Sequence, residues 1–261
     1  MRVFGIRFTV LKLSALLAFA LSAIVTHAGV PDLSAGVLFR SYPISTVGAV
    51  NAGYGQVLWG DNATPFYGYV RATGDFYTAA TYNALVGGVE FFPLAFLGAR
   101  AGGEANQNDN DYIAYQCELY ECLGRRYRTY FESELTLGAG PFFVQGKWRR
   151  ERWSRKDADG GDFIDPTSGF VLKSQGDSET VYTGAAGMKI NAQWTALVSV
   201  RYAESDEYKG YSRMPAVLAR YVTGVWTFAG GVGQYESSVK TKEVTAMGFV
   251  RWEFAPSVTL K

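Results

Sequence analysis

Charged side chains recur at every second position on both sides of a glycine-containing turn. They are Arg126, Arg128, Glu132 and Glu134 before Gly138–Pro141, and Lys147, Arg149 and Glu151 after it. Groups of this kind form ion pairs or line a path for polar solutes, and two carboxylates can share general acid and base work. Glu132 and Glu134 are only two residues apart on one strand. We therefore favour a role for them as partners of basic residues on the neighbouring strand over a role as a catalytic pair.

The scarcity of histidine argues against most hydrolytic chemistry in this chain. The only histidine is His27, and it lies within a segment that is predicted to be removed. Without it, no Ser-His-Asp or Cys-His mechanism and no imidazole metal ligand is available. We therefore expect no enzyme activity, with a lipid-modifying membrane enzyme as a remote alternative, and no cofactor.

Two loop segments carry residues that could bind metal or form a disulfide. In an exported chain the close pair Cys117 and Cys122 is expected to form a local disulfide. The acidic run DADGGD superficially resembles a calcium loop through Asp157, Asp159 and Asp162. Since it lacks EF-hand spacing and the closing glutamate, it is a weak candidate, and we expect a solvated loop and no metal site.

The N-terminus has the pattern of a secretory signal peptide. The basic residues Arg2, Arg7 and Lys12 precede an apolar run from Leu13 to Val25, and small residues follow at 26–28. We expect residues 1–28 to be cleaved; an uncleaved anchor is the alternative. Cleavage would leave 22 basic residues of the 25 against 24 acidic ones. This balance gives no electrostatic case for nucleic acid as a partner.

The elements that must position these residues are strands. Period-two alternation predicts twelve strands and no helix after residue 28. The two longest connections, 106–123 and 154–177, follow the fifth and seventh strands, whereas turns after even-numbered strands are short. The expected strands are 34–42, 47–59, 66–77, 81–92, 95–104, 126–137, 142–153, 178–190, 193–204, 209–221, 224–236 and 240–254.

The central hairpin has one register that satisfies both of its faces. A two-residue turn at Ala139-Gly140 would place Glu132 opposite Lys147, Arg128 opposite Glu151, Glu134 opposite Gln145 and Phe131 opposite Trp148. Opposite charges and aromatic pairs directly across a ladder stabilise a hairpin. The pattern leaves open whether the apolar face meets protein or lipid.

Over residues 34–254 the chain resembles a Gram-negative outer-membrane β-barrel. Long loops alternate with short turns, and the final run GFVRWEF carries Val250, Trp252 and Phe254 on one face. A tail, 255–261, follows where many such proteins stop at the aromatic residue. The resemblance implies an all-β fold, a single antiparallel transmembrane barrel over residues 29–261 in the outer membrane of a Gram-negative bacterium. It also implies contacts with membrane lipid and the barrel assembly machinery. A soluble sandwich or lipocalin-like barrel is the alternative.

Two functions follow from this barrel. A narrow porin-like channel for small hydrophilic solutes would use the inward charges for selectivity, whereas a closed structural or surface-interaction barrel would use them as internal salt bridges. Twelve strands leave both open, and the solute is not identified. The expected lumen-lining residues are Arg71, Asp75, Arg100, Glu104, Arg128, Glu132, Glu134, Lys147, Arg149, Glu151, Arg201, Arg251 and Glu253.

Two further arginines point outward in the predicted register. Arg150 and Arg152 would lie just beyond the Phe131/Trp148 pair, where outward charges are tolerated at the membrane interface. We expect them to contact lipopolysaccharide phosphates, which suit guanidinium geometry. Simple solvent exposure is the alternative.

Overall fold

The computed structural model describes residues 29–42, 44–79, 82–109, 120–155, 161–165, 168–174 and 176–259. The predicted signal peptide over residues 1–28 lies outside these ranges, as do Cys117, Asp157 and Asp159. Among the described residues there is no helix that is long and apolar enough to cross a membrane.

Twelve antiparallel strands close into one barrel, which confirms the predicted all-β fold. The strands follow one another around the wall, and β1 pairs with β14 to close it. Their bounds are β1 Val30–Ser41, β2 Ile44–Trp59, β3 Gly68–Thr78, β4 Tyr82–Leu94, β5 Leu97–Asn108, β6 Gly124–Ala139, β7 Phe142–Arg155, β10 Asp177–Lys189, β11 Trp194–Ser205, β12 Tyr211–Thr223, β13 Trp226–Ser237 and β14 Lys240–Ala255. A separate two-stranded ribbon, β8 Phe163–Ile164 and β9 Val171–Leu172, lies in the connection after β7.

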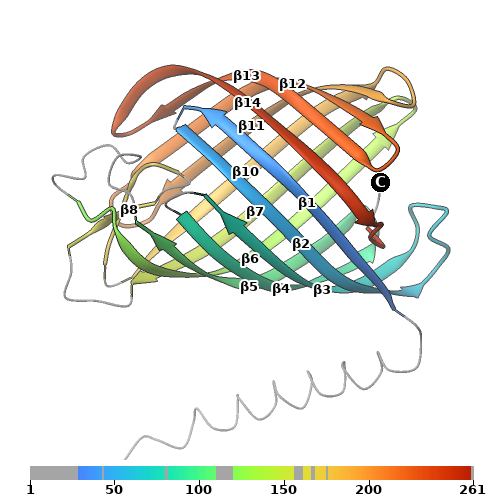
Figure 1. Cartoon of the computed structure of the whole chain (residues 1–261), viewed down its shortest axis with the longest axis horizontal. Coiled ribbons are helices and arrows are strands. Elements are labelled where there is room, and N and C mark those ends of the chain that lie inside the picture. Colours follow the sequence, from blue (N-terminus) through green and yellow to red (C-terminus); the bar gives the residue numbers. More distant parts are fainter. Residues whose placement is uncertain are drawn as a thin grey trace, which may run out of the picture.

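The two ends of the barrel differ in their connections. We call the end where β1 begins and β14 ends the terminal end, and the opposite end the loop end; they lie at the right and left of Figure 1. The long connections after β5 and β7 both lie at the loop end, and the turns after β4, β6 and β12 at the terminal end are short. This is the predicted asymmetry. The eight-position connection 60–67 at the terminal end is longer than the other turns there.

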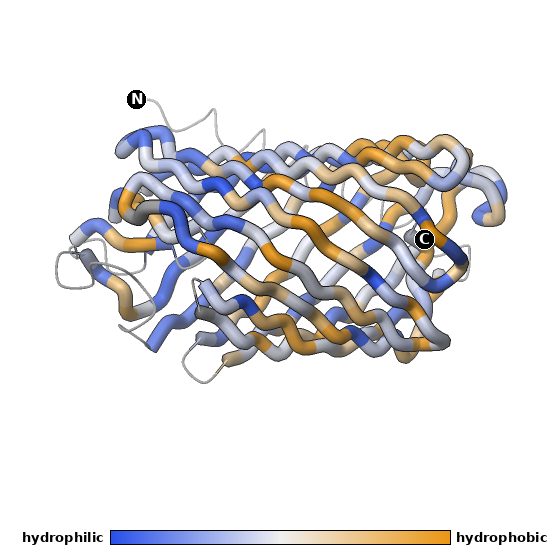
Figure 2. The backbone as a smooth tube through the Cα atoms, turned by 90° about the horizontal axis from the view of Figure 1, so that it is seen from above, coloured by the Kyte–Doolittle hydropathy of each residue, from blue (hydrophilic) through white to orange (hydrophobic). Residues whose placement is uncertain are grey.

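The outward face of the wall is apolar. On β14, Val244, Trp252 and Phe254 are exposed, and other strands repeat this pattern with Val50, Val198 and other large apolar side chains. Hydrophobic residues recur along the strands through the middle of the barrel, while hydrophilic ones gather toward the loop end (Figure 2). An apolar surface of this extent is stable against lipid and not against water.

Aromatic side chains form a belt at the terminal end of the outer face. Trp194 and Trp226 begin their strands there, Trp59 ends β2, and all three are exposed. The Trp226 ring stacks on Trp252 with centroids 5.2 Å apart. Aromatic rings of this kind sit at the boundary between hydrocarbon and headgroups.

The predicted register of the β6–β7 hairpin is wrong by two residues. The turn is at Gly140-Pro141, so Ala139 pairs with Phe142 and Glu132 lies opposite Arg149 instead of Lys147. The reason is the backbone of the turn: Gly140 has φ +59°, a conformation that glycine adopts easily and alanine does not. A turn at Ala139-Gly140 would have put alanine in that first central position.

A shift of two residues keeps every side chain on its predicted face. Several predicted partners therefore still meet, as diagonal neighbours. Arg128 lies opposite Trp153 yet reaches Glu151 at 2.9 Å. The Phe131 and Trp148 rings make an edge contact with centroids 6.1 Å apart.

Candidate functional site: the inner wall and its two ends

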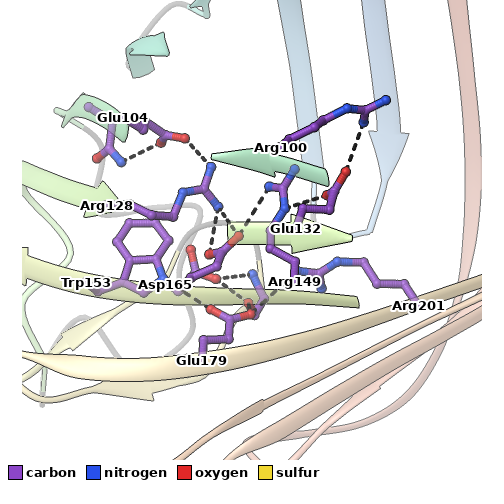
Figure 3. A network of polar contacts seen from close by, with 12 residues as sticks. Arg100, Glu104, Arg128, Glu132, Arg149, Trp153, Asp165, Glu179 and Arg201 are labelled. Atoms are coloured by element: carbon purple, nitrogen blue, oxygen red, sulfur yellow. Dashed lines mark hydrogen bonds and ion pairs between the residues drawn. The ribbon is translucent and has the colours of Figure 1, made fainter. Parts of the chain in front are cut away.

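A continuous chain of ion pairs covers the inner face of the wall from β1 to β7. Alternation brings these side chains to one face, and adjacent strands bring opposite charges together. The pairs are Arg71–Asp32 at 2.6 Å, Arg71–Glu90 at 3.3 Å, Arg100–Glu90 at 3.1 Å, Arg100–Glu132 and Arg100–Glu134 both at 2.9 Å, Lys147–Glu134 at 3.1 Å, Arg149–Glu132 at 2.7 Å, Arg149–Glu151 at 3.3 Å, Arg128–Glu151 at 2.9 Å, and Arg128–Glu104. We call this set the wall network; part of it is shown in Figure 3.

Four of the six carboxylates of the network, Glu90, Glu132, Glu134 and Glu151, have two basic partners each. Glu132 on β6 accepts from Arg100 on β5 and from Arg149 on β7. Glu151 on β7 accepts from both Arg128 and Arg149. Replacing one base therefore does not leave these four acids unpaired, whereas Asp32 and Glu104 each depend on a single arginine.

Most of the expected lumen-lining residues meet in this network. Asp75 instead accepts a hydrogen bond of 2.9 Å from Asn51, and Arg201 pairs with Glu179 on β10 at 3.6 Å. Arg251 and Glu253 share the inward face of β14 and take no part in the pairs just described. Asp32 is a member that the alternation pattern did not single out, since the strand was expected to begin at residue 34.

A segment of the connection after β7 folds into the loop end of the barrel. This segment, 161–165 and 168–174, carries Phe163, Phe170 and Leu172, none of which is exposed. They form a buried cluster with Trp153, Val181 and Ala203, which are inward residues of β7, β10 and β11. We call it the inward segment. A long loop was expected over 154–177, and its apolar residues at 163–164 and 170–172 were the signal for this packing.

Polar contacts fasten the inward segment to the wall. The Ser168 hydroxyl lies 2.6 Å from Glu179 Oε1 and also contacts Asp165 Oδ2. A serine hydroxyl has one hydrogen, so it can donate to one of these carboxyls, and the other contact needs a proton on a carboxyl. The Trp153 indole donates to Glu179 Oε2 at 3.2 Å. Figure 3 shows Trp153, Asp165 and Glu179 gathered beside the wall network.

The terminal end has its own aromatic cluster. Tyr67, Tyr69 and Phe92 are buried there with Val258 of the tail, and the Tyr69 and Phe92 rings stack with centroids 4.9 Å apart. The Tyr67 hydroxyl donates to the Val258 carbonyl at 2.7 Å. The tail beyond the final aromatic residue therefore packs against the barrel.

The remaining candidates lie in or near the loops. Asp162 accepts hydrogen bonds from the Ser174 amide at 3.0 Å and from the Tyr208 hydroxyl, which raises the pKa of Tyr208 to about 12. Cys122 is buried, but Cys117 lies outside the described residues, so the disulfide stays a prediction, as does a metal-free loop at Asp157 and Asp159.

The two outward arginines differ in their surroundings. Arg150 donates to Thr180 at 2.6 Å and pairs with Asp206 of the next loop. This hydrogen bond holds the pKa of Asp206 below its usual value. Arg152 is exposed on the outer face. Contact with lipopolysaccharide stays a prediction for both.

No family model and no curated protein sequence matches the chain. Among solved structures it is similar to the KdgM porin, with TM-score 0.44 and 9% identity, covering 85% of this chain and 99% of that one. OmpT, an outer membrane protein of Vibrio cholerae, gives a TM-score of 0.40 at 10% identity, covering 88% and 99%. An anion-selective porin from Comamonas acidovorans gives 0.39 at 8% identity, covering 87% and 98%.

The architecture itself classifies the chain. Closed antiparallel strands leave no unpaired edge in lipid, and the apolar outer face with its aromatic belt matches a membrane boundary. The chain is a closed antiparallel β-barrel with an apolar outer face, and its location in the outer membrane of a Gram-negative bacterium stays an expectation. Outer-membrane barrels place their long loops outside the cell, so we expect the loop end to face the exterior.

Proposed function

We propose that the protein is a narrow channel for small hydrophilic solutes. The observation that carries this proposal is the partial exposure of Arg100, Lys147 and Arg149 in the middle of the inner wall. Their carboxylate partners are buried against the wall, so the basic groups face a space that water can enter. A sealed interior would instead bury both partners of each pair.

The opposite wall supports the same function. Half of the inward positions of β11, β12 and β13 carry glycine, alanine or serine, including Ser199, Ala216 and Gly231. Small side chains on one wall leave room for a path beside the long charged side chains of the other. The inward segment narrows this path at the loop end, as a constriction does in a selective pore.

A closed, non-transporting barrel is the second candidate. It is favoured by the inward segment, whose side chains fill part of the loop end, and by the tail and aromatic cluster at the terminal end. In this alternative the wall network is structural, and the exterior connections supply a surface for partners. An enzymatic role has less support, because the Ser168 hydroxyl that touches two carboxyls is fully buried and no solute reaches it.

Single-channel recording separates the two candidates. Purified protein inserted into planar lipid bilayers is expected to give discrete conductance steps. The folded state is checked on the same sample, since an intact barrel migrates differently in unboiled and boiled gels. Protein that shows this shift and yet never conducts would exclude the channel and leave the closed barrel.

A further inference from the structure

The charges of the inner wall stand in two layers. For the strand-central pairs, the basic side chain is accessible and its acidic partner is not. Arg149 is 27% exposed and Glu151 2%; Arg100 is 25% exposed and Glu132 6%. The acids therefore form a layer against the wall, and the bases form a layer that faces the lumen.

The same layering continues around the wall. Lys147 is 26% exposed above Glu134 at 11%, and Arg201 on β11 is 24% exposed above Glu179 at 0%. The cause is side-chain length: a guanidinium or ammonium group on a long stem reaches past a glutamate on the neighbouring strand. Four basic groups on β5, β7 and β11 thus present positive charge to the same space.

Three strands of the facing wall add no acid to this space, and the acids beyond them are the half-buried Glu243 and Glu253 on the inward face of β14. The inward positions of β11, β12 and β13, all of which are described, include no aspartate or glutamate. Their charged members are Arg201 and the exposed Arg220. Glu204 and Glu236 of these strands lie on the outward face.

The count of charges alone would predict no selectivity. Acids such as Asp75, which is half-buried and bound to Asn51, bring the totals on the inner face close to balance. The potential that a mobile ion experiences depends instead on its distance from each charge. Nearer charges dominate because the screening length is about 10 Å at 0.1 M salt. An ion in the lumen lies closer to the basic layer than to the acidic layer behind it, and so experiences a positive potential.

We infer that this channel selects for small anions, such as carboxylate- or phosphate-bearing solutes, over cations of the same size. The inference rests on the proposed channel function and names the class of solute that its wall favours. The accessible Arg100, Lys147, Arg149 and Arg201 attract the anion, while the buried acids hold these bases in place.

The test is the zero-current potential of the purified protein in a planar bilayer under a potassium chloride gradient. A wall whose more accessible charges are mainly basic carries a potential of about one kT or more, so we expect chloride to permeate at least threefold better than potassium at ~0.1 M salt. The ratio should fall toward one at ~1 M salt, where the screening length is about 3 Å. This arm needs no variant.

Arg149→Gln tests the basic layer directly. Glu132 keeps Arg100 and Glu151 keeps Arg128, so the variant is expected to fold. Its chloride preference should fall markedly, because one of the accessible basic groups of the inner wall is lost. Arg220→Gln should lower the preference as well. Arg152→Gln removes the same charge from the outer face of the same strand and should leave the ratio unchanged.

The outcomes are distinct. A wild-type ratio of one or below would overturn the anion selectivity while the current itself supports a channel. An unchanged ratio in both Arg149→Gln and Arg220→Gln would overturn the role of the basic layer. Absence of any current in folded protein would overturn the proposed channel and, with it, the selectivity.

Discussion

The Tyr235 hydroxyl donates a 2.7 Å hydrogen bond to the carbonyl oxygen of Ser168, joining β13 to the inward segment. Both residues are buried. The segment also contacts β7, β10 and β11, so this bond ties it to a further strand of the barrel mouth. The position of the inward segment, the proposed constriction, thus depends on a few contacts that substitution can remove singly.

Tyr235→Phe should loosen the inward segment. The ring is kept, but the buried Ser168 carbonyl loses its donor, at a cost of about 1–3 kcal/mol. Single-channel records of the variant should show a higher mean conductance or more current noise than the wild type. Tyr182→Phe, which removes an exposed hydroxyl on the outer face, is the control. Identical records for Tyr235→Phe and wild type would contradict a constricting role.

Arg128→Gln should destabilise the barrel strongly. It removes the base between Glu104 and Glu151, whose carboxylates are nearly inaccessible. Losing one partner of a buried pair costs about 3–5 kcal/mol, although Glu151 keeps Arg149. Urea unfolding followed by the gel shift of unboiled protein measures this. Arg125→Gln on the same strand, where the side chain is exposed, should shift the midpoint little.

Gly140→Ala should be costlier than Gly146→Ala. A Cβ at either position would meet no atom within 4 Å, so space is equal, but only Gly140 has positive φ. An alanine there costs about 1–2 kcal/mol. At Gly146 the effect should be near zero or stabilising, since alanine reduces the freedom of the unfolded chain. Equal unfolding free energies for the two variants would argue against the Gly140-Pro141 turn.

The Arg150–Asp206 pair should contribute modestly to stability, and this contribution should be lost in acid. Because Arg150 depresses the pKa of Asp206, the contribution is present above the ordinary aspartate pKa and is lost as pH falls through the depressed value. The pair is largely exposed, which limits it to about 0.2–1 kcal/mol. The difference in unfolding free energy between wild type and Arg150→Gln at pH 7 should therefore vanish in strong acid. A free-energy difference that persists in strong acid would show that the Arg150 side chain stabilises the barrel by packing and not through the ion pair.

Arg152→Ala should weaken binding to lipopolysaccharide more than Arg150→Ala does. Arg152 is exposed on the outer face, whereas Arg150 is already paired with Asp206. A guanidinium group that is free to approach a phosphate gains more from it than one with a carboxylate partner. Titration of purified protein with lipopolysaccharide compares the two. If the double variant binds as wild type does, the predicted contact is wrong.

Sequence alternation predicts the strands well because it is a local property. Each of the twelve strands overlaps its expected range, including β12, which contains Pro215. Ladder pairing with β13 is interrupted beside this proline, between Arg213 and Ala216. That break is how a strand inside the wall accommodates a residue without an amide hydrogen.

Register and loop packing are not local, and there the sequence is less informative. Shifting β6–β7 by two residues preserves both faces and leaves Arg128 within reach of Glu151. Charge matching therefore could not choose between the two registers, and the backbone of Gly140 did. Likewise, Ser168 and Glu179 meet only because the inward segment folds back into the barrel.

Closure through β1 and β14 sets an order on biogenesis. β14 pairs with β13 and with β1, so the first strand to leave the ribosome stays without its second partner until the last has arrived. Until then two strand edges have open amide and carbonyl groups, which hydrocarbon does not tolerate. The strands therefore cannot enter the membrane one at a time with all of their backbone groups paired. The edges of the unfinished sheet must be kept covered until β14 is available to pair with β1 and close the barrel.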